Sequence, residues 1–377
     1  MFGSRNFLFA AGDVPINNYG KLFTWSNNNS GQLGQNNTTF ISSPVQVGAI
    51  ATWTKVASGK LFSLAIKQDG TLWAWGKNNF GQLGQNNATS ISSPVQIGAG
   101  TTWKSISVSQ YTSFAIKTDG TMWAWGENYP FGQMGVSVRY HYSSPKQIGA
   151  LTTWDSLGKP NYSSWNGAAI KTDGTMWMWG RNDFGQLGIG VGYGNNRSSP
   201  VQVLGTNWKK VQFGNIACVA LKTDGTIWSW GCGYNGRLGH STAHGVHYSS
   251  PKQIGGSTDW ADISTTNESG HAVKTGGTMW AWGYNGAGRF GNDTASVNTS
   301  SPIQIGALTK WSLITASGSA AVLATKTDNT LWAWGSNTNG VLGLGNTANR
   351  SSPVQVGLLK KWVSVSVSTH SIGILSA

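Results

Sequence analysis

Short stretches of apolar residues recur along the whole chain, and turn signals rich in glycine separate them. In residues 62–76, FSLAIKQDGTLWAWG, two such stretches flank an Asp-Gly dipeptide. Asp-Gly between two apolar runs is a strong signal for a β-hairpin turn, because both residues tolerate positive φ. Trp73 and Trp75 are two positions apart, so they share one face of a strand, and Ala74 lies on the other. The pattern predicts short antiparallel strands with one bulky face and one small face.

The Trp-x-Trp-Gly phrase repeats at a nearly constant interval. Its second tryptophan falls at Trp75, Trp125, Trp179, Trp230, Trp282 and Trp334, and a variant copy that starts with Phe23 adds Trp25. A Ser-Ser-Pro-x-Gln motif also occurs seven times, and a lone tryptophan follows each copy. Each unit is interpreted as four strands, with the Ser-Ser-Pro strand first and the Trp-x-Trp-Gly strand last. Repeats of about 50 residues that are built from short strands are typical of β-propellers.

The two chain ends complement one another. The segment 362–375, WVSVSVSTHSIGIL, has the second and third strands of a unit and then stops, and residues 21–26, KLFTWS, provide the missing fourth. Sharing one blade between both ends closes a ring and leaves no open end blade. The sequence therefore predicts an all-β fold, a closed seven-bladed β-propeller of four-stranded antiparallel blades. This single domain is expected over residues 20–377, after an N-terminal extension at 1–19.

The repeated tryptophans are interpreted as packing elements between blades. A side chain that recurs identically in every unit serves the common core more simply than it serves one ligand. A fully buried tryptophan also removes a large apolar area from water. The alternative, a platform for sugars or nucleic-acid bases, predicts instead that these rings are dispensable for stability.

A second phrase, Gly-x-Leu-Gly, follows each tryptophan pair. It reads GQLG at 31–34, 81–84 and 185–188, with variants at 132–135, 236–239, 288–291 and 340–343. With the preceding strands, this unit resembles the repeat of the regulator of chromosome condensation (RCC1-like) propellers over nearly the whole chain. The uniform blades, abundant asparagine and low charge resemble the bacterial and phage type. The namesake of the family is an exchange factor for a small GTPase and binds chromatin, but no protruding wedge like the one it uses is found here.

Charge changes this picture little. Only 10% of residues are charged, yet the net charge is +13 and the pI about 9.7. Six lysines recur two residues before the hairpin turns, and aspartates in the same turns are expected to offset them: Lys67, Lys117, Lys171, Lys222, Lys274 and Lys326. Without a concentrated basic stripe, nucleic-acid binding is not expected. Nonspecific attraction to acidic surfaces is the favoured interpretation.

Few residues point to chemistry. After the five turn aspartates, only eight acidic residues are left, and no catalytic order or phosphate loop stands out. We expect no enzyme activity and no cofactor. Cys218 is expected opposite Gly231, with its thiol on the other sheet face from that of Cys232, so no disulfide is expected. No signal peptide or transmembrane segment is indicated.

The recognition site is expected on varied loops of one propeller face, the face with the long Gly-x-Leu-Gly loops. Residues 158–167 form a loop longer than its equivalents, and Tyr162 and Trp165 within it are the predicted anchors. His240, His244 and His247 follow in the next blade and extend the predicted patch. Three imidazoles could hold Zn²⁺ or Ni²⁺, but solvated loop histidines are favoured because no helix or thiolate pair aligns them.

Two functional hypotheses result. The first is a non-catalytic binding or structural propeller in a phage virion, a tail-fibre or receptor-binding component or a capsid decoration. Its partners would be other subunits of an assembly or a host-surface ligand, without membrane insertion. The alternative is a cytoplasmic regulator of the nucleotide-exchange or chromatin-binding type.

Overall fold

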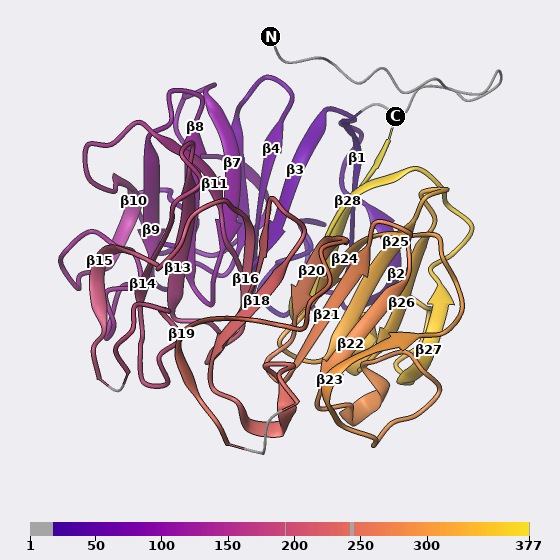
Figure 1. Cartoon of the computed structure of the whole chain (residues 1–377). Coiled ribbons are helices and arrows are strands. Elements are labelled where there is room, and N and C mark those ends of the chain that lie inside the picture. The colour runs from indigo at the N-terminus through magenta and orange to yellow at the C-terminus, as the bar shows by residue number, and fades with distance from the viewer. Residues whose placement is uncertain (1–17, 193, 242–244, 377) are drawn as a thin grey trace, which may run out of the picture.

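The chain folds into seven four-stranded antiparallel blades arranged around a central axis (Figure 1). The computed structural model describes residues 18–192, 194–241 and 245–376. The first three blades after the N-terminal strands are β3 (Trp53–Ser58), β4 (Phe62–Lys67), β5 (Leu72–Gly76) and β6 (Ile91–Gln96); β7 (Trp103–Val108), β8 (Thr112–Lys117), β9 (Met122–Gly126) and β10 (Tyr142–Gln147); and β11 (Trp154–Leu157), β13 (Asn166–Lys171), β14 (Met176–Gly180) and β15 (Arg197–Gln202).

The next three blades repeat this order. They are β16 (Trp208–Phe213), β17 (Ala217–Lys222), β18 (Ile227–Gly231) and β19 (Tyr248–Gln253); β20 (Trp260–Thr265), β21 (Ser269–Lys274), β22 (Met279–Gly283) and β23 (Thr299–Ile305); and β24 (Trp311–Ala316), β25 (Ala321–Lys326), β26 (Leu331–Gly335) and β27 (Arg350–Gln355). A two-residue strand, β12 (Lys159–Pro160), pairs in parallel with β16. None of the described helices is long and apolar enough to cross a membrane.

The seventh blade contains both ends of the propeller. Strands β28 (Trp362–Val367) and β29 (His370–Ser376) come from the C-terminal part, and β1 (Gly20–Ser26) and β2 (Ile41–Gln46) from the N-terminal part. Seven residue pairs join β1 to β29, and the two strands lie side by side in Figure 1. The predicted all-β propeller and its shared blade are confirmed.

The grouping of strands within a unit differs from the prediction. Each Ser-Ser-Pro strand pairs with the preceding Trp-x-Trp-Gly strand, as β6 does with β5, and forms the outer edge of that blade. Each end of the chain therefore supplies two strands to the shared blade, where one and three were predicted. The prediction was wrong because the loop from 77 to 90 turns the chain back onto its own sheet, and sequence order alone does not show this.

Two faces follow from the strand directions. The Asp-Gly turns and the connections between blades form one face, which we call the turn face; Trp103 N bonds to Gly70 O across it at 3.1 Å. The opposite loop face carries the long loops between third and fourth strands and the short loops between first and second strands. Lys60 N bonds to Gln110 O on this face at 3.3 Å. The long Gly-x-Leu-Gly loops therefore share one face, as predicted.

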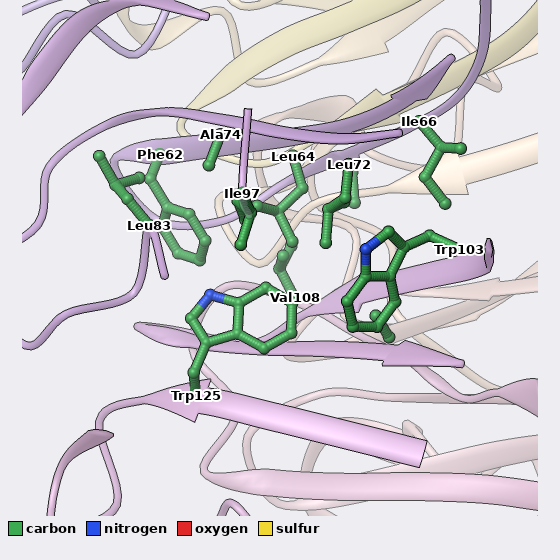
Figure 2. Packing of buried hydrophobic residues seen from close by; sticks show 12 residues of the cluster. Phe62, Leu64, Ile66, Leu72, Ala74, Leu83, Ile97, Trp103, Val108 and Trp125 are labelled. Carbon is green, nitrogen blue, oxygen red and sulfur yellow. The ribbon is translucent and has the colours of Figure 1, made fainter. Parts of the chain in front are cut away.

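A tryptophan closes every seam between neighbouring blades. Its indole nitrogen donates to a backbone carbonyl in the long loop of the preceding blade: Trp25 to Val341, Trp75 to Gln32, Trp125 to Gln82, Trp179 to Gln133, Trp230 to Gln186, Trp282 to Arg237 and Trp334 to Arg289, at 2.9–3.0 Å. All seven rings are fully buried. Figure 2 shows Trp125 in one seam, facing Leu64, Leu83 and Ile97.

This contact also accounts for the Gly-x-Leu-Gly phrase. A Cβ on Gly34 would come 2.8 Å from the Trp75 indole nitrogen, and Gly34 has a φ of +70°. A Cβ on Gly31 would come 2.6 Å from Ser92 in the next blade. Glycine is needed at both positions because the loop lies directly against the neighbouring sheet.

The turn lysines stack on tryptophan. Each is held between the first tryptophan of the inner strand and the first of the Trp-x-Trp-Gly phrase, as Lys67 Nζ is, 5.0 Å from the Trp53 centroid and 3.5 Å from that of Trp73. Lys117, Lys171, Lys222, Lys274 and Lys326 repeat the arrangement. In the turns, the Asp69 carboxylate accepts hydrogen bonds from Thr71. Cation–π contact therefore places these lysines. The predicted offset by the turn aspartates acts as well, because burial lowers the pKa of Lys67 while the charge of Asp69 raises it.

The shared blade confirms that the lysine and the tryptophan work as a unit. At the position equivalent to Lys67, paired with the inner tryptophan Trp362, it has Leu375, and Phe23 replaces the first tryptophan of the phrase. The Phe23 and Trp362 rings meet edge to face at 5.7 Å. In the blade where phenylalanine replaces one of the two tryptophans, leucine replaces the lysine.

Cys218 and Cys232 are both free, as expected, and both are buried. The predicted register is off by one residue, since Cys218 pairs with Trp230 and Ala217 with Gly231. The Cys218 thiol lies 3.1 Å from the Gln186 carbonyl of the preceding blade. Burial raises the pKa of this thiol well above its ordinary value.

We expect Trp125→Ala to lower the free energy of unfolding by about 3–5 kcal/mol, because it leaves a cavity in a seam. Trp125→Phe keeps most of the ring and should cost less, because the Gln82 carbonyl still accepts a bond from Ser113. Urea unfolding measures both. The control Tyr140→Ala, at a site 76% exposed, should change stability by less than about 0.5 kcal/mol. A cost near zero for Trp125→Ala would contradict the packing interpretation.

Deletion of residues 1–26 should give insoluble or strongly destabilised protein. It removes β1 and the Trp25 indole donor, and it exposes the unpaired edge of β29. The control deletes only residues 1–17, upstream of every described strand, and should melt like the full chain. Equal melting temperatures for both truncations would contradict the shared blade.

Candidate functional site: the loop face

Six of the seven long loops that form most of the loop face are held by a buried asparagine. Asn78 Oδ1 accepts a hydrogen bond from Leu83 N at 2.9 Å, and its Nδ2 donates to Asn87 O at 3.0 Å. Asn28, Asn128, Asn182, Asn285 and Asn337 make the equivalent bond to the backbone. These fixed loops present side chains from defined positions.

One such position differs in every blade. The residue directly after the Trp-Gly phrase, or after Ser26 in the shared blade, is Asn27, Lys77, Glu127, Arg181, Cys232, Tyr284 or Ser336. The residue before the first glycine of Gly-x-Leu-Gly also varies, and it is phenylalanine only at Phe80, Phe131 and Phe184. These three phenylalanines belong to consecutive blades, so one side of the loop face has a composition of its own.

Aromatic rings gather at the three seams next to these phenylalanines. Phe80 contacts Tyr111 of the next blade with ring centroids 5.3 Å apart, and Phe131 contacts Trp165 at 5.6 Å. His247 lies 5.6 Å from Phe184 and 5.0 Å from Tyr234. All seven rings retain some exposed surface, and we call them the aromatic arc.

Cations lie beside the arc. Lys60 and Lys77 each place Nζ 5.4 Å from the Tyr111 centroid, and the Arg181 guanidinium lies 5.5 Å from that of Phe131. Arg181 also pairs with Asp183 at 2.6 Å, which holds its side chain in place. Partly exposed aromatic and basic side chains in this arrangement suit an acidic partner surface.

Glu127 is a buried carboxylate at the same seam as Tyr111. Only 7% of it is exposed, and no described residue donates a hydrogen bond to its buried Oε2. Burial raises its pKa to about 7, although the charge of Lys60 acts in the opposite direction. This group therefore changes charge near neutral pH within the candidate site.

The lengthened loop at 158–167, between the first and second strands of its blade, covers the central channel at the loop face. Asn161 Nδ2 donates to Asn267 Oδ1 at 2.9 Å, and Asn267 donates to Ser163 Oγ at 3.1 Å, two blades away. Tyr162 reaches Gly318, where a Cβ would come 3.2 Å from its Cε1 atom. Of the two predicted anchors, Trp165 lies in the aromatic arc and Tyr162 lies over the channel.

Beneath this loop lies a cavity of ≈ 60 Å³, lined by the inner strands of six blades and by Lys159, Pro160 and Asn161 of the loop itself. Lys159 lines it, and its pKa is lowered to about 8, first by burial and then by the charge of Lys210. Asp262 raises this pKa and pairs with Lys210. The channel is thus narrow and basic.

The predicted histidines do not form one patch. His240 lies at the outer perimeter, where its Nε2 is 2.9 Å from Ser229 Oγ and burial lowers its pKa to about 4. His247 belongs to the arc, and its Nδ1 accepts a bond from Gly233 N at 3.0 Å. His244 lies outside the described residues. Within the described ranges, no three His, Cys, Asp or Glu side chains are grouped as metal ligands.

The sequence analysis selected Trp165 and His247, but it missed the other five rings of the arc because it searched for added loop length and histidines and did not compare the seven copies position by position. Phe80, Phe131 and Phe184 stand at one repeat position, and a comparison of the seven copies at that position would have marked the three adjacent blades. The pairing of each phenylalanine with a ring from the next blade depends on the closed ring.

The comparisons with known proteins agree with this fold. The model of the regulator of chromosome condensation (RCC1) repeat matches residues 19–66, 69–116, 173–221, 224–268 and 328–374. A second RCC1 repeat model matches 53–82 and 103–133. Human WBSCR16 superposes with a TM-score of 0.83 and 20% identity over 95% of this chain and 99% of that one. Yeast Prp20p, whose structure was described together with its binding to Gsp1p and histones, gives 0.83 and 17% over 95% and 92%.

Two curated relatives are plant proteins, and the match covers only part of each. The mitochondrial RCC1 domain-containing protein RUG3 of Arabidopsis thaliana is 27% identical over 65% of this chain, and the match spans 59% of its length. The ultraviolet-B receptor UVR8 of the same plant is 26% identical over 55% of this chain and half of its own. These comparisons lend no support to the bacterial or phage type.

We expect Glu127→Gln to stabilise the protein above neutral pH. Because the folded chain holds this proton more tightly than the unfolded chain, its contribution is complete below the ordinary pKa of 4.5 and is lost as pH rises through about 7. The variant should therefore exceed the wild type by about 1–3 kcal/mol at pH 8 and match it at pH 4.5. Urea unfolding across this range tests the expectation.

Glu268→Gln is the control, because it removes an ion pair with Arg289 at 3.2 Å instead of a buried unpaired charge. It should not stabilise the protein at pH 8. A Glu127→Gln difference that stays constant with pH would contradict titration of Glu127 in this range.

Proposed function

The chain belongs to the regulator of chromosome condensation (RCC1) repeat family, and from this membership we propose that it is a non-catalytic propeller that binds a protein partner. The aromatic arc of the loop face is the docking surface in this proposal. Its support is the concentration of ring–ring contacts between neighbouring blades at three adjacent seams of the loop face. Aromatic and arginine side chains provide a disproportionate share of interface energy.

The proposed partner has an acidic surface. Lys60, Lys77 and Arg181 border the arc, and the chain as a whole has a net charge of +13. Trp165 is the proposed central anchor, with Tyr162 and His247 at its two sides. His240 is left out because it lies at the perimeter.

Of the two functions considered from the sequence, a regulator is the better supported. Among proteins of similar fold, yeast Prp20p binds Gsp1p and histones, and it also forms a complex with Kap60. A virion role draws no support from these comparisons.

The test compares Trp165→Ala and Tyr111→Ala with Tyr284→Ala in quantitative affinity enrichment from cells of the source organism. Tyr284 is a matched control, because it is partly buried on the loop face outside the arc and Arg289 stacks on it at 4.8 Å. We expect the two arc variants to enrich at least tenfold less of a partner protein than the wild type does, and Tyr284→Ala to enrich as much of it as the wild type. The enriched partner should also dissociate as salt rises.

Equal loss in all three variants, or retention in all, would contradict the arc as the docking surface. Single substitutions are preferred to shortening residues 160–165, because that loop also covers the channel.

A further inference from the structure

The central channel contains a lysine that has no counterpart in the other blades. The residue five positions after the inner tryptophan is Lys159 in the blade of β11, where the chain leaves its own sheet and pairs with β16. In the other six blades this residue is uncharged and buried: Ser58, Val108, Phe213, Thr265, Ala316 and Val367. Lys159 is instead exposed to the channel. One blade therefore presents an ammonium group to the channel from a position that the others use for packing.

The Lys159 ammonium has no counterion among the described residues, because its Nζ atom makes no hydrogen bond or ion pair with any of them. The acid whose charge acts on it, Asp262, is already occupied. Lys210 Nζ binds one oxygen of that carboxylate, and Ile314 N donates to the other at 3.0 Å. Lys55 brings a further positive charge to this part of the channel. An enclosed charge without a partner is unfavourable, and a bound anion would offset it.

Hydroxyl groups on the facing wall of the channel are free to donate hydrogen bonds. Thr315 of β24 and Ser364 of β28 line the cavity, and neither hydroxyl bonds to another described residue. The Ser58 and Ser366 hydroxyls, by contrast, lie 2.8 Å apart and satisfy one another. The blades of β24 and β28 stand three and four places round the ring from that of β11, so they face Lys159 across the channel. No described aspartate or glutamate lines the cavity.

The size of the cavity limits the ligand. A water molecule needs about 10–15 Å³ of such a space, and the cavity measures ≈ 60 Å³. It therefore accommodates roughly four to six atoms of that size, which corresponds to one tetrahedral oxyanion. The hydrogen bond between Asn161 and Asn267 closes the channel at the loop face. An ion therefore enters from the turn face, where Lys55 is exposed.

We propose that the central channel is a binding site for a small tetrahedral oxyanion of the sulfate or phosphate class. The Lys159 ammonium provides the opposite charge, and the Thr315 and Ser364 hydroxyls donate to the anion's oxygens from the facing wall. Lys55 and Lys210 add a positive potential that attracts the ion into the channel. The site is independent of the aromatic arc and of the partner proposed for it.

The test is a calorimetric titration of the full chain with sodium sulfate, and with sodium chloride at equal ionic strength as the reference. We expect one saturable sulfate site at millimolar concentrations and none for chloride, and inorganic phosphate should compete for the sulfate site. Phenyl phosphate distinguishes two sources of the same chemistry. Binding as tight as that of inorganic phosphate assigns the site to the phosphoryl end of a larger ligand, and much weaker binding assigns it to a free ion.

The affinity for sulfate should fall as the pH rises through about 8. Burial lowers the pKa of Lys159 to about 8, and its neutral amine no longer attracts an anion. The other charged groups that act on Lys159 are Lys210 of β16, Asp262 of β20 and Lys55 of β3, and none of the cavity-lining residues of β7, β24 and β28 titrates. Sulfate itself keeps its charge over this range, so the change reports on the protein. The dependence should vanish in Lys159→Met.

Variants then locate the site. Lys159→Met should weaken sulfate binding at least tenfold, and its melting temperature without sulfate should equal or exceed that of the wild type because an enclosed charge is removed. Thr315→Val should weaken binding by a smaller factor. The control Lys360→Met removes an exposed lysine from a connection on the same face, outside the channel, and should bind sulfate like the wild type. Absence of saturable sulfate binding, unchanged binding by Lys159→Met, or an equal loss in Lys360→Met would each overturn the proposal.

Discussion

The structure depends on one interblade contact, the indole N–H of a buried tryptophan donating to a backbone carbonyl in the preceding blade's loop. It combines the burial of a large ring with a hydrogen bond that satisfies the only polar atom of that ring, so a seam gains apolar contact without leaving an unpaired donor. The same loop must approach the ring closely, which requires glycine at both ends of the Gly-x-Leu-Gly phrase. The seventh such bond, from Trp25 to Val341, joins residues 316 positions apart and closes the ring.

A second constraint acts toward the turn face. In six blades a lysine is held over two tryptophans, so the ring of cations belongs to the packing of each sheet and not to a free charged surface. The shared blade departs from this rule at both positions together, with Leu375 and Phe23. A lysine ammonium needs the electron-rich face of an indole more than an aliphatic side chain does, which explains why the two residues change as a pair.

On the frame set by these contacts, three kinds of varied position change the surface of the molecule. The residues at the start of the long loops vary on the loop face and form the aromatic arc over three seams. The residue three positions before the inner tryptophan varies at the perimeter, between aliphatic residues, glycine and serine. The loop at 158–167 closes the channel through the hydrogen bond between Asn161 and Asn267. Each set changes one surface of the molecule without disturbing a seam.

The sequence by itself determined the repeat, the number of blades, the shared blade and the burial of the second tryptophan in each phrase. These features are encoded in local spacing, because hairpin turns and strand faces depend on residues close together in the chain. It did not determine that the Ser-Ser-Pro strands join the preceding sheet, that the turn lysines stack on tryptophan, or that Phe80 and Tyr111 meet across a seam. Those contacts join different strands and blades, so only the closed ring, which sets the distance and angle between neighbouring sheets, decided them.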